Sequence, residues 1–351
     1  MVVFHRFIDI NFCRFFWWRR IYLRKILMKK KAAILSLLLL FFALLFNSVY
    51  RILLEHNVNL KASYIQRQRI DAEVLFHGPC EPLFTINPAY LESKWNKKVY
   101  NLSLDHSDFA DNYLHLYLYL KSNKVPEYLF LYVTPESFDL HYNTFHTYRF
   151  IPFMNDSLVE ATVNDCDSNY AEWSNLPLLK YTYFGNRLNL LALQGFKHLV
   201  SGRDSAYFVN GYEDHKQNPL TFMDGEIPND SLLWGNLPSA NKYPLGVSFT
   251  WNENRARYFA KVLDLATSKG IKTILYESPS YLAVVETQPD RLDFLLKTRK
   301  IAHKYDVPYW IFDDTEISDL HQNFVSQQIM NSKASVQFMD ILYERIKENH
   351  K

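Results

Sequence analysis

The residue best suited to covalent chemistry in this sequence is Cys80, which follows a short apolar run through the turn-forming pair Gly78-Pro79. A thiol is a better nucleophile than a hydroxyl because a few per cent of it is already thiolate at neutral pH. Such a nucleophile works with a base that takes its proton and a third group that orients the base. The candidates for the base are His77, beside the turn, and His321, with Asp319 as its orienter.

Three interpretations of Cys80 stay open at this stage. It is a working nucleophile, or it pairs with Cys166 in a disulfide, which an oxidising extracytoplasmic space would permit, or it is a buried, unreactive thiol. For His321, a position in a surface loop is the simpler interpretation. Asp313 and Asp314 are consecutive carboxylates that point to different sides of a strand, so a solvated strand end explains them better than acid–base chemistry.

Metal and cofactor motifs are absent from the sequence. No pair of histidines has the spacing of a zinc site, and three cysteines are too few for a four-cysteine site. No glycine-rich loop has the pattern that holds a nucleotide phosphate. We therefore expect neither a metal nor a cofactor.

The elements that must position these residues alternate between apolar runs and amphipathic stretches. Phe109, Tyr113 and Leu116 recur at helical spacing behind Ser107, a good N-cap, and Gly270 stands where a helix C-terminal glycine belongs. The pattern predicts strands at 73–76, 99–102, 128–133, 271–276 and 309–312, and helices at 107–123, 252–269, 290–305 and 332–347. This alternation indicates an α/β domain with a parallel sheet covered on both faces. Ligands bind such sheets at the carboxyl ends of the strands.

Residues 140–250 interrupt this alternation. They are rich in Tyr, Asn, Pro and Trp, and only Leu178 to Leu199 has a helical pattern. An insertion of this length in an α/β domain is usually functional or partner-facing. Five of its aromatic residues could stack on sugar rings, although ordinary packing is the simpler interpretation: Trp173, Tyr181, Tyr183, Phe184 and Trp234.

The N-terminal part of the chain predicts a single membrane-spanning helix. Residues 1–31 carry nine basic side chains and one acid, a net charge of +8, which leaves −6 for the remainder because the whole chain carries +2. Nineteen uncharged residues follow, from Ala32 to Tyr50, and a helix of this length nearly matches a hydrocarbon core of about 30 Å. The basic flank favours a cytoplasmic N-terminus. We expect a stalk over 51–70 and an extracytoplasmic domain over 71–351.

Residues 1–27 have two open interpretations. They are an over-long gene model, because Met28 followed by three lysines would make an ordinary start, or an interfacial segment, because Phe15 to Trp18 beside Arg19 and Arg20 suit a headgroup layer. A cleaved signal peptide is disfavoured because its apolar region would be shorter. Nucleic-acid binding by this basic run is the weakest alternative, and we expect no nucleic-acid partner.

Five blocks of sequence, in order, carry a resemblance to a known family. They are Gly78 to Cys80 with Ile86-Asn87-Pro88, Val99 to Ser103, Leu129 to Phe138, Gly270 to Pro279, and Phe324 to Ala334. With these blocks the sequence resembles the SGNH/GDSL hydrolase superfamily, in particular its membrane-anchored branch linked to O-acylation of cell-envelope polymers such as alginate and teichoic acid. The resemblance implies a flavodoxin-like three-layer domain with residues 140–250 as a large irregular insertion.

In the register of that resemblance, the catalytic site is degenerate. Cys80 stands at the position of the nucleophilic serine, Ser326 replaces the catalytic aspartate and Ile329 replaces the histidine. The positions that the resemblance assigns to the oxyanion pocket are Gly78, Asn101 and Ser103. Because isoleucine cannot accept a proton, the ordinary hydrolase mechanism is absent at the matched positions.

The resemblance implies a role in attaching or removing acyl groups on an envelope polysaccharide. It also implies a place in a bacterial inner membrane, beside a multi-pass acyltransferase that supplies the acyl group. The replaced positions favour a binding or scaffold protein over an enzyme. Two alternatives stay open: an active ester hydrolase or acyltransferase that uses Cys80 with a displaced histidine, and a structural membrane protein unrelated to acyl transfer.

Overall fold

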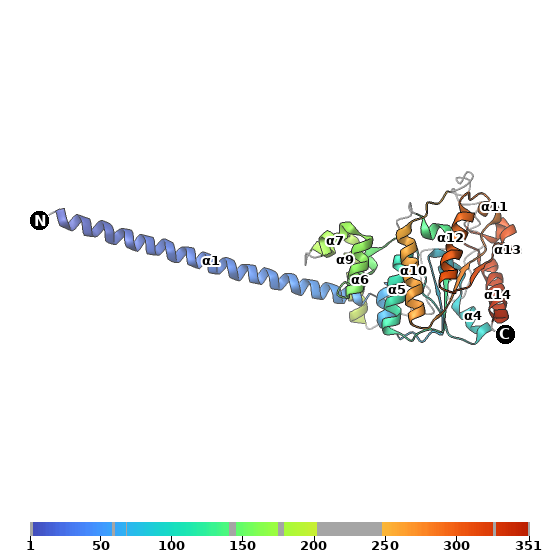
Figure 1. The fold of residues 1–351 in the computed structure, drawn as a ribbon. Helices are drawn as coiled ribbons and strands as arrows, with labels where there is room; N and C mark the ends of the chain where they lie inside the picture. Colours follow the sequence, from blue (N-terminus) through green and yellow to red (C-terminus); the bar gives the residue numbers. More distant parts are fainter. Residues whose placement is uncertain are drawn as a thin grey trace.

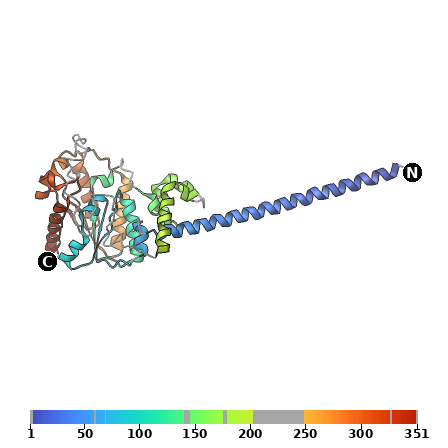
Figure 2. The same ribbon diagram turned by 180° about the vertical axis from the view of Figure 1, so that it is seen from behind.

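The structure is a computed structural model of the full chain. It describes residues 3–57, 60–67, 69–139, 145–174, 179–201, 248–325 and 328–349. A long N-terminal helix leads away from an α/β domain, and the C-terminus lies on the side of the domain far from that helix (Figures 1 and 2).

The domain is built on a five-stranded parallel sheet with the order β2-β1-β3-β4-β5. The strands are β1 (Val74–His77), β2 (Val99–Asn101), β3 (Tyr128–Tyr132), β4 (Lys272–Glu277) and β5 (Tyr309–Ile311). All five lie within the predicted strand regions or within one residue of them. The apolar runs predicted them well because a parallel strand is buried on both faces.

Helices cover both faces of the sheet, as the alternation of elements predicts. Alternate strand residues enter two separate cores, because successive side chains of a strand point to opposite faces. Leu75 and Leu129 pack with α5 (Phe109–Ser122), α10 (Glu253–Ser268) and α12 (Arg291–Lys304). Phe76 and Phe130 pack with α4 (Pro88–Trp95), α13 (Glu316–Asp319) and α14 (Ser332–Asn349).

Two helix ends test the sequence signals directly. Helix α10 ends one residue before Lys269, and Gly270 follows with φ +70°, the left-handed conformation that favours glycine. Helix α5 begins after Asp108, whose carboxylate accepts hydrogen bonds from the backbone of Ala110 and Asp111. The N-cap is therefore Asp108 and not Ser107, one residue later than predicted.

Short helices are the elements that the sequence pattern missed. They are α2 (Lys61–Arg67), α3 (Cys80–Thr85), α4, α11 (Leu282–Val285), α13 and the 3-10 turns η1 (Pro135–Phe138), η2 (Thr147–Arg149), η3 (Ile151–Phe153) and η6 (His321–Asn323). In the insertion, α8 (Leu179–Thr182) and α9 (Asn186–Ser201) match the predicted helical stretch, but α6 (Ser157–Cys166) and α7 (Ser168–Ser174) were not expected. Elements of one or two turns carry too few periodic positions to be recognised.

The N-terminal helix α1 runs from Val3 to Glu55 without a break. Its part from Arg24 to Glu55 is long and apolar enough to cross a membrane by length and composition, and its most apolar window is not buried by the rest of the chain. Leu54, near the end of α1, and Ile65 of α2 are fully buried in the domain core. The region predicted as a stalk therefore packs as part of the domain.

Candidate functional site

The loops that follow β1 and β2 are joined at the carboxyl edge of the sheet. The two strands are adjacent and parallel, so their following loops leave the sheet side by side. The Gly78 carbonyl accepts hydrogen bonds from the Leu104 backbone N–H (3.0 Å) and the Ser107 hydroxyl (3.2 Å). This pairing holds Cys80, the first residue of α3, against the turn Asp105-His106.

Gly78 has no room for a side chain. It adopts φ +159°, and a Cβ atom placed on it would lie 2.7 Å from the Cβ of Tyr132 and 2.9 Å from the Cγ of Pro82. The chain can therefore turn from β1 into α3 only because this residue is a glycine. The glycine that the resemblance assigns to the pocket is thus required by packing against β3.

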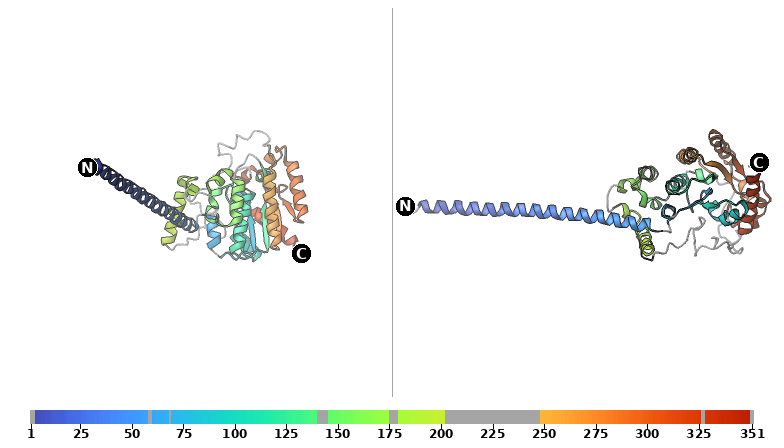
Figure 3. Two further views of the ribbon diagram at one scale, coloured as in Figure 1. Left: turned by 60° about the vertical axis from the view of Figure 1, so that its left-hand side comes forward. Right: turned by 90° about the horizontal axis from the view of Figure 1, so that it is seen from below.

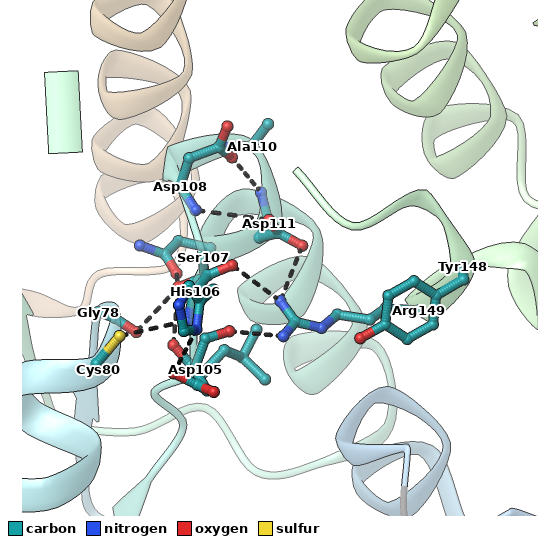
Figure 4. A network of polar contacts seen from close by, with 12 residues as sticks. Gly78, Cys80, Asp105, His106, Ser107, Asp108, Ala110, Asp111, Tyr148 and Arg149 are labelled. Atoms are coloured by element: carbon teal, nitrogen blue, oxygen red, sulfur yellow. Dashed lines mark hydrogen bonds and ion pairs between the residues drawn. The ribbon is translucent and has the colours of Figure 1, made fainter. Parts of the chain in front are cut away.

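Three groups that can do chemistry meet where these two loops join. One ligand-type atom each of Cys80, Asp105 and His106 lies within 4.8 Å of the others. The His106 Nδ1 lies 2.7 Å from an Asp105 carboxylate oxygen, and the backbone N–H of His106 donates to the Cys80 sulfur at 3.4 Å. Figure 4 shows the sulfur pointing toward this turn. A thiol, an imidazole and a carboxylate are the groups that nucleophilic catalysis combines.

The thiol of Cys80 is protonated at neutral pH. Burial raises its pKa well above the ordinary value, and the carboxylates of Glu81 and Asp105 raise it further; the His106 N–H acts in the opposite direction. Among the described residues, the charged groups that act on this thiol are carboxylates and not cations that would hold it as a thiolate. A thiol in this setting reacts by giving its proton to a neighbouring base during attack.

Arg149 holds the Asp105-His106 turn in place. Its Nη2 donates to the Asp105 carbonyl (2.6 Å) and its Nη1 reaches the His106 carbonyl (3.5 Å). The same guanidinium lies 3.5 Å from the fully buried carboxylate of Asp111. His106 itself has φ +47°, a left-handed conformation that is costly for a residue with a side chain. Strained residues of this kind concentrate at functional sites.

A second group of carboxylates lies at the same edge of the sheet. Burial raises the pKa of both Glu81 and Glu136, which follow β1 and β3, and the Glu136 carboxylate raises the pKa of Glu81 further. Gln328 donates to Glu136 and acts to lower its pKa. Beyond them, Arg291 pairs with Glu277 at 2.8 Å and with Asp313. Asp313 therefore belongs to a largely buried ion cluster, and the predicted solvated strand end is wrong for this residue.

The raised pKa of Glu81 predicts that the stability of the fold depends on pH. Burial and the Glu136 carboxylate raise its pKa from 4.5 to about 8. The folded state therefore keeps a proton that the unfolded chain releases, so the stability linked to Glu81 is full below about pH 4.5 and is lost as pH rises toward 8. We expect Glu81→Gln to stabilise the protein by about 1–3 kcal/mol at pH 8.5 and by little at pH 4.5.

Thermal unfolding of the full chain in detergent at the two pH values measures this effect. The matched control is Glu348→Gln, a substitution at an exposed glutamate of α14, which should shift neither melting temperature. A Glu81→Gln protein that is destabilised at pH 8.5 would show that the carboxylate is ionised and favourably bound in the fold.

The other residues that the sequence proposed for the oxyanion pocket are held by structural hydrogen bonds. Asn101 is fully buried, and its amide donates to the carbonyls of Pro82 (2.8 Å) and Ile86 (3.2 Å). The backbone N–H of Ser103 donates to the Asn101 side chain, and the Ser103 carbonyl accepts from Lys61. These hydrogen bonds fix α3 and the loop that follows β2 in their positions.

The contacts described for the two proposed bases are with residues other than Cys80. The His77 ring is fully buried and bonds to the Asn112 carbonyl (2.9 Å), and burial lowers its pKa to about 3. His321 and Asp319 are exposed, and the His321 ring packs on Tyr281. The described contacts of the Cys80 sulfur are with the Asp105-His106 turn and Glu81.

The remaining candidates divide into four cases. Ser326 lies outside the described residues, as does Trp234 of the aromatic set. The Ile329 carbonyl accepts from the backbone N–H of Val325 (2.9 Å).

Cys80 and Cys166 are both free thiols, so the disulfide interpretation does not hold. The other four aromatic residues pack against one another or against α1, as in the ring pairs of Tyr183 with Trp173 and Phe184, and of Tyr181 with Tyr50.

The trio Cys80, Asp105 and His106 also has the composition of a metal site. Thiolate, carboxylate and imidazole are the ligands that zinc takes, and three of them with an open fourth position is the pattern of catalytic zinc. The sequence search looked for paired histidines, so it could not find ligands that two different loops contribute. The signal that could have found them is an adjacent Asp-His pair directly after the second strand.

Comparison with known proteins assigns neither a family nor a function to the chain. No protein-family model matches the sequence, and the search of curated proteins gives no match.

Proposed function

We propose that this chain is a membrane-anchored, SGNH-hydrolase-like protein that moves acyl groups on or off an envelope polysaccharide, with Cys80 as the residue that carries the acyl group. The observation that supports it is the meeting of Cys80 with Asp105 and His106 at the carboxyl edge of a parallel sheet. The proposal adopts the active alternative from the sequence, with His106 in place of His321 as the displaced histidine.

The fold supports this proposal in two ways. The strand order 2-1-3-4-5 is the one that flavodoxin-like domains share, and such domains bind ligands at the carboxyl ends of their strands. Gln328, next to Ile329, contacts Glu136 at the same edge that carries Cys80 and Glu81. The last block of the resemblance thus approaches the loop after β3, and this proximity supports the proposal.

The proposed reaction uses the groups that meet at Cys80. The Cys80 sulfur adds to the carbonyl carbon of an ester while its proton passes to the imidazole of His106, which Asp105 orients through Nδ1. Collapse of the tetrahedral adduct breaks the bond to the alcohol oxygen, which takes the proton, and leaves a thioester on the sulfur. Attack by water then releases the acid, whereas attack by a sugar hydroxyl transfers the acyl group.

The test is a short-chain acyl ester assay on the full chain in detergent, combined with mass spectrometry of the Cys80 peptide. We expect an acyl adduct on the sulfur, its loss in Cys80→Ala, and a roughly 100-fold lower rate in His106→Gln, the size of a general-base contribution. His303→Gln, an exposed histidine of α12, is the matched control. Loss of activity in His321→Gln, with His106→Gln active, would overturn the assignment of His106.

A second candidate function is a non-catalytic scaffold beside a multi-pass acyltransferase in a bacterial inner membrane. Two observations favour it: an isoleucine stands at the histidine position of the resemblance, and the thiol is buried among carboxylates that keep it protonated. It predicts no adduct and no hydrolysis in any variant. It also predicts that Cys80→Ala keeps the association with envelope components, while deletion of α1 abolishes it.

A further inference from the structure

Helix α9 carries two apolar faces, and only one of them is covered. Leu188, Ala192 and Gly195 are buried against the rest of the chain. A second row remains exposed, with between 45% and 69% of each side chain accessible: Leu190, Leu193, Phe196, Leu199 and Val200. An exposed apolar row of this kind on one helix marks an interaction surface.

The covered face packs directly on the end of α1. A Cβ atom on Gly195 would lie 1.6 Å from the carbonyl oxygen of Leu53, so the two helices cross in backbone contact. The Tyr50 hydroxyl donates to Asn189 (2.6 Å), and the Asn57 amide donates to the Leu191 carbonyl (2.8 Å). Helix α9 is therefore fixed to α1 where its apolar segment, exposed through Val49, comes to an end.

The direction of α9 suits a membrane surface. Figure 1 shows α9 running across the line of α1, between the free length of α1 and the sheet, and the right-hand view of Figure 3 shows α1 leading straight away from the domain. A helix that crosses α1 steeply at the end of its apolar segment lies along the bilayer plane when α1 spans the bilayer. An interfacial helix has this orientation.

The charges of α9 also suit a position at a membrane surface. The helix contains no acidic residue, and Lys197 is basic and exposed, whereas Arg187 stacks on the Tyr148 ring at 3.8 Å and donates to its hydroxyl (2.7 Å). Long basic side chains can extend to lipid phosphates while their apolar stems stay at the acyl boundary. Leucine, valine and phenylalanine on one face, combined with basic residues and no acids, are typical of helices that bind anionic lipid.

We infer that α9 is an interfacial helix whose exposed face, Leu190 to Val200, lies in the lipid of the membrane that α1 crosses. The occupant is the bilayer because α9 is fixed to α1 at the point up to which the apolar residues of α1 are exposed, so the two exposed apolar surfaces adjoin. The inference rests on the membrane-anchored part of the proposed function and is independent of the chemistry at Cys80. It gives the domain a fixed face toward the bilayer.

Photocrosslinking from the full chain tests this inference. A benzophenone amino acid replaces Phe196, Leu40 of α1 or Leu296 of α12 in separate proteins, each reconstituted in vesicles of phosphatidylethanolamine and phosphatidylglycerol. Leu296 is the matched control because it is 57% exposed and belongs to a helix of the sheet domain. We expect lipid adducts at position 196 to approach those at position 40 and to exceed those at position 296 at least tenfold.

Each other outcome overturns the inference in a distinguishable way. Adducts at position 40 with no excess at position 196 over 296 would show that α1 spans the bilayer while α9 lies in water. A protein–protein adduct of twice the chain mass from position 196 would make a second copy the occupant. No adduct at position 40 would remove the span itself, and with it both this inference and the anchored part of the proposed function.

Discussion

Replacing Arg149 with methionine is expected to lower the free energy of unfolding at pH 8 by about 3 kcal/mol, because one partner of a buried ion pair is removed and the other remains. Asp111 is fully buried beside this guanidinium, and the carbonyls of Asp105 and His106 also lose their donor. Thermal unfolding of the full chain in detergent measures the loss, at roughly 2–4 °C of melting temperature per kcal/mol.

The loss should depend on pH in a defined direction. Burial raises the pKa of Asp111 to about 8 even though Arg149 acts to lower it. Without Arg149 that pKa rises further, so the folded state holds a proton that the unfolded chain releases above about pH 4. Stability from this group is then complete at low pH and is lost as pH rises. We expect the Arg149→Met deficit to be larger at pH 8 than at pH 5.

Two further variants separate the pair from general surface effects. Arg257→Met removes an exposed ion pair with Asp165 and should change stability by less than about 1 kcal/mol. Asp111→Asn in the Arg149→Met background removes the carboxylate that lacks its partner and should recover part of the loss at pH 8. An Arg149→Met protein as stable as wild type would mean that water replaces the guanidinium at no cost.

Replacing Gly78 with alanine is expected to cost about 2–4 kcal/mol and to displace the thiol. The added methyl group would lie 2.7 Å from the Tyr132 Cβ, a contact between two atoms that are fixed to backbone, and the residue has φ +159°. Overpacking typically costs about 1–3 kcal/mol, and backbone strain adds to it. Because Cys80 follows two residues later, its sulfur moves away from the Asp105-His106 turn.

Gly270→Ala is the control that isolates packing from backbone conformation. Gly270 has φ +70°, but nothing lies within 4 Å of a Cβ placed there. It should therefore cost only about 1–2 kcal/mol from the left-handed conformation. Unfolding measures both variants, and the rate of thiol alkylation reports the exposure of Cys80. Equal losses at the two glycines, with unchanged alkylation, would contradict the role of Gly78 as a packing constraint.

The sequence predicts the sheet and the long helices well, because their signals are local. Each strand is a short apolar run, and α5, α10, α12 and α14 each repeat apolar residues over three turns or more. The site at Cys80 is a different case. His106 was missed because the resemblance directed the search for a base to the last block, near Ile329. Its position depends on the pairing of two loops by Gly78 and Leu104, and no periodic pattern encodes such a pairing.

The two missed helices α6 and α7 illustrate another physical limit. Their buried side chains include Val159, Val163 and Tyr170, too few to form a repeating stripe over one to three turns. Asp156 caps α6 by accepting from the backbone of Leu158 and Val159, which is a signal that a search for N-caps could have used. Tertiary packing, more than local propensity, determines helices of this length.

The unbroken course of α1 has a consequence for how the domain meets its substrate. A helix of 53 residues is about 80 Å long, well over twice the thickness of a hydrocarbon core. Its last turns are part of the domain, so there is no joint at which the domain could swing. With α1 across a bilayer, as we propose, the site at Cys80 stays at one height above the membrane and can move only in its plane. For the acyl-group chemistry that we propose, this geometry would favour substrates held at a constant depth, such as a glycan still attached to a lipid carrier.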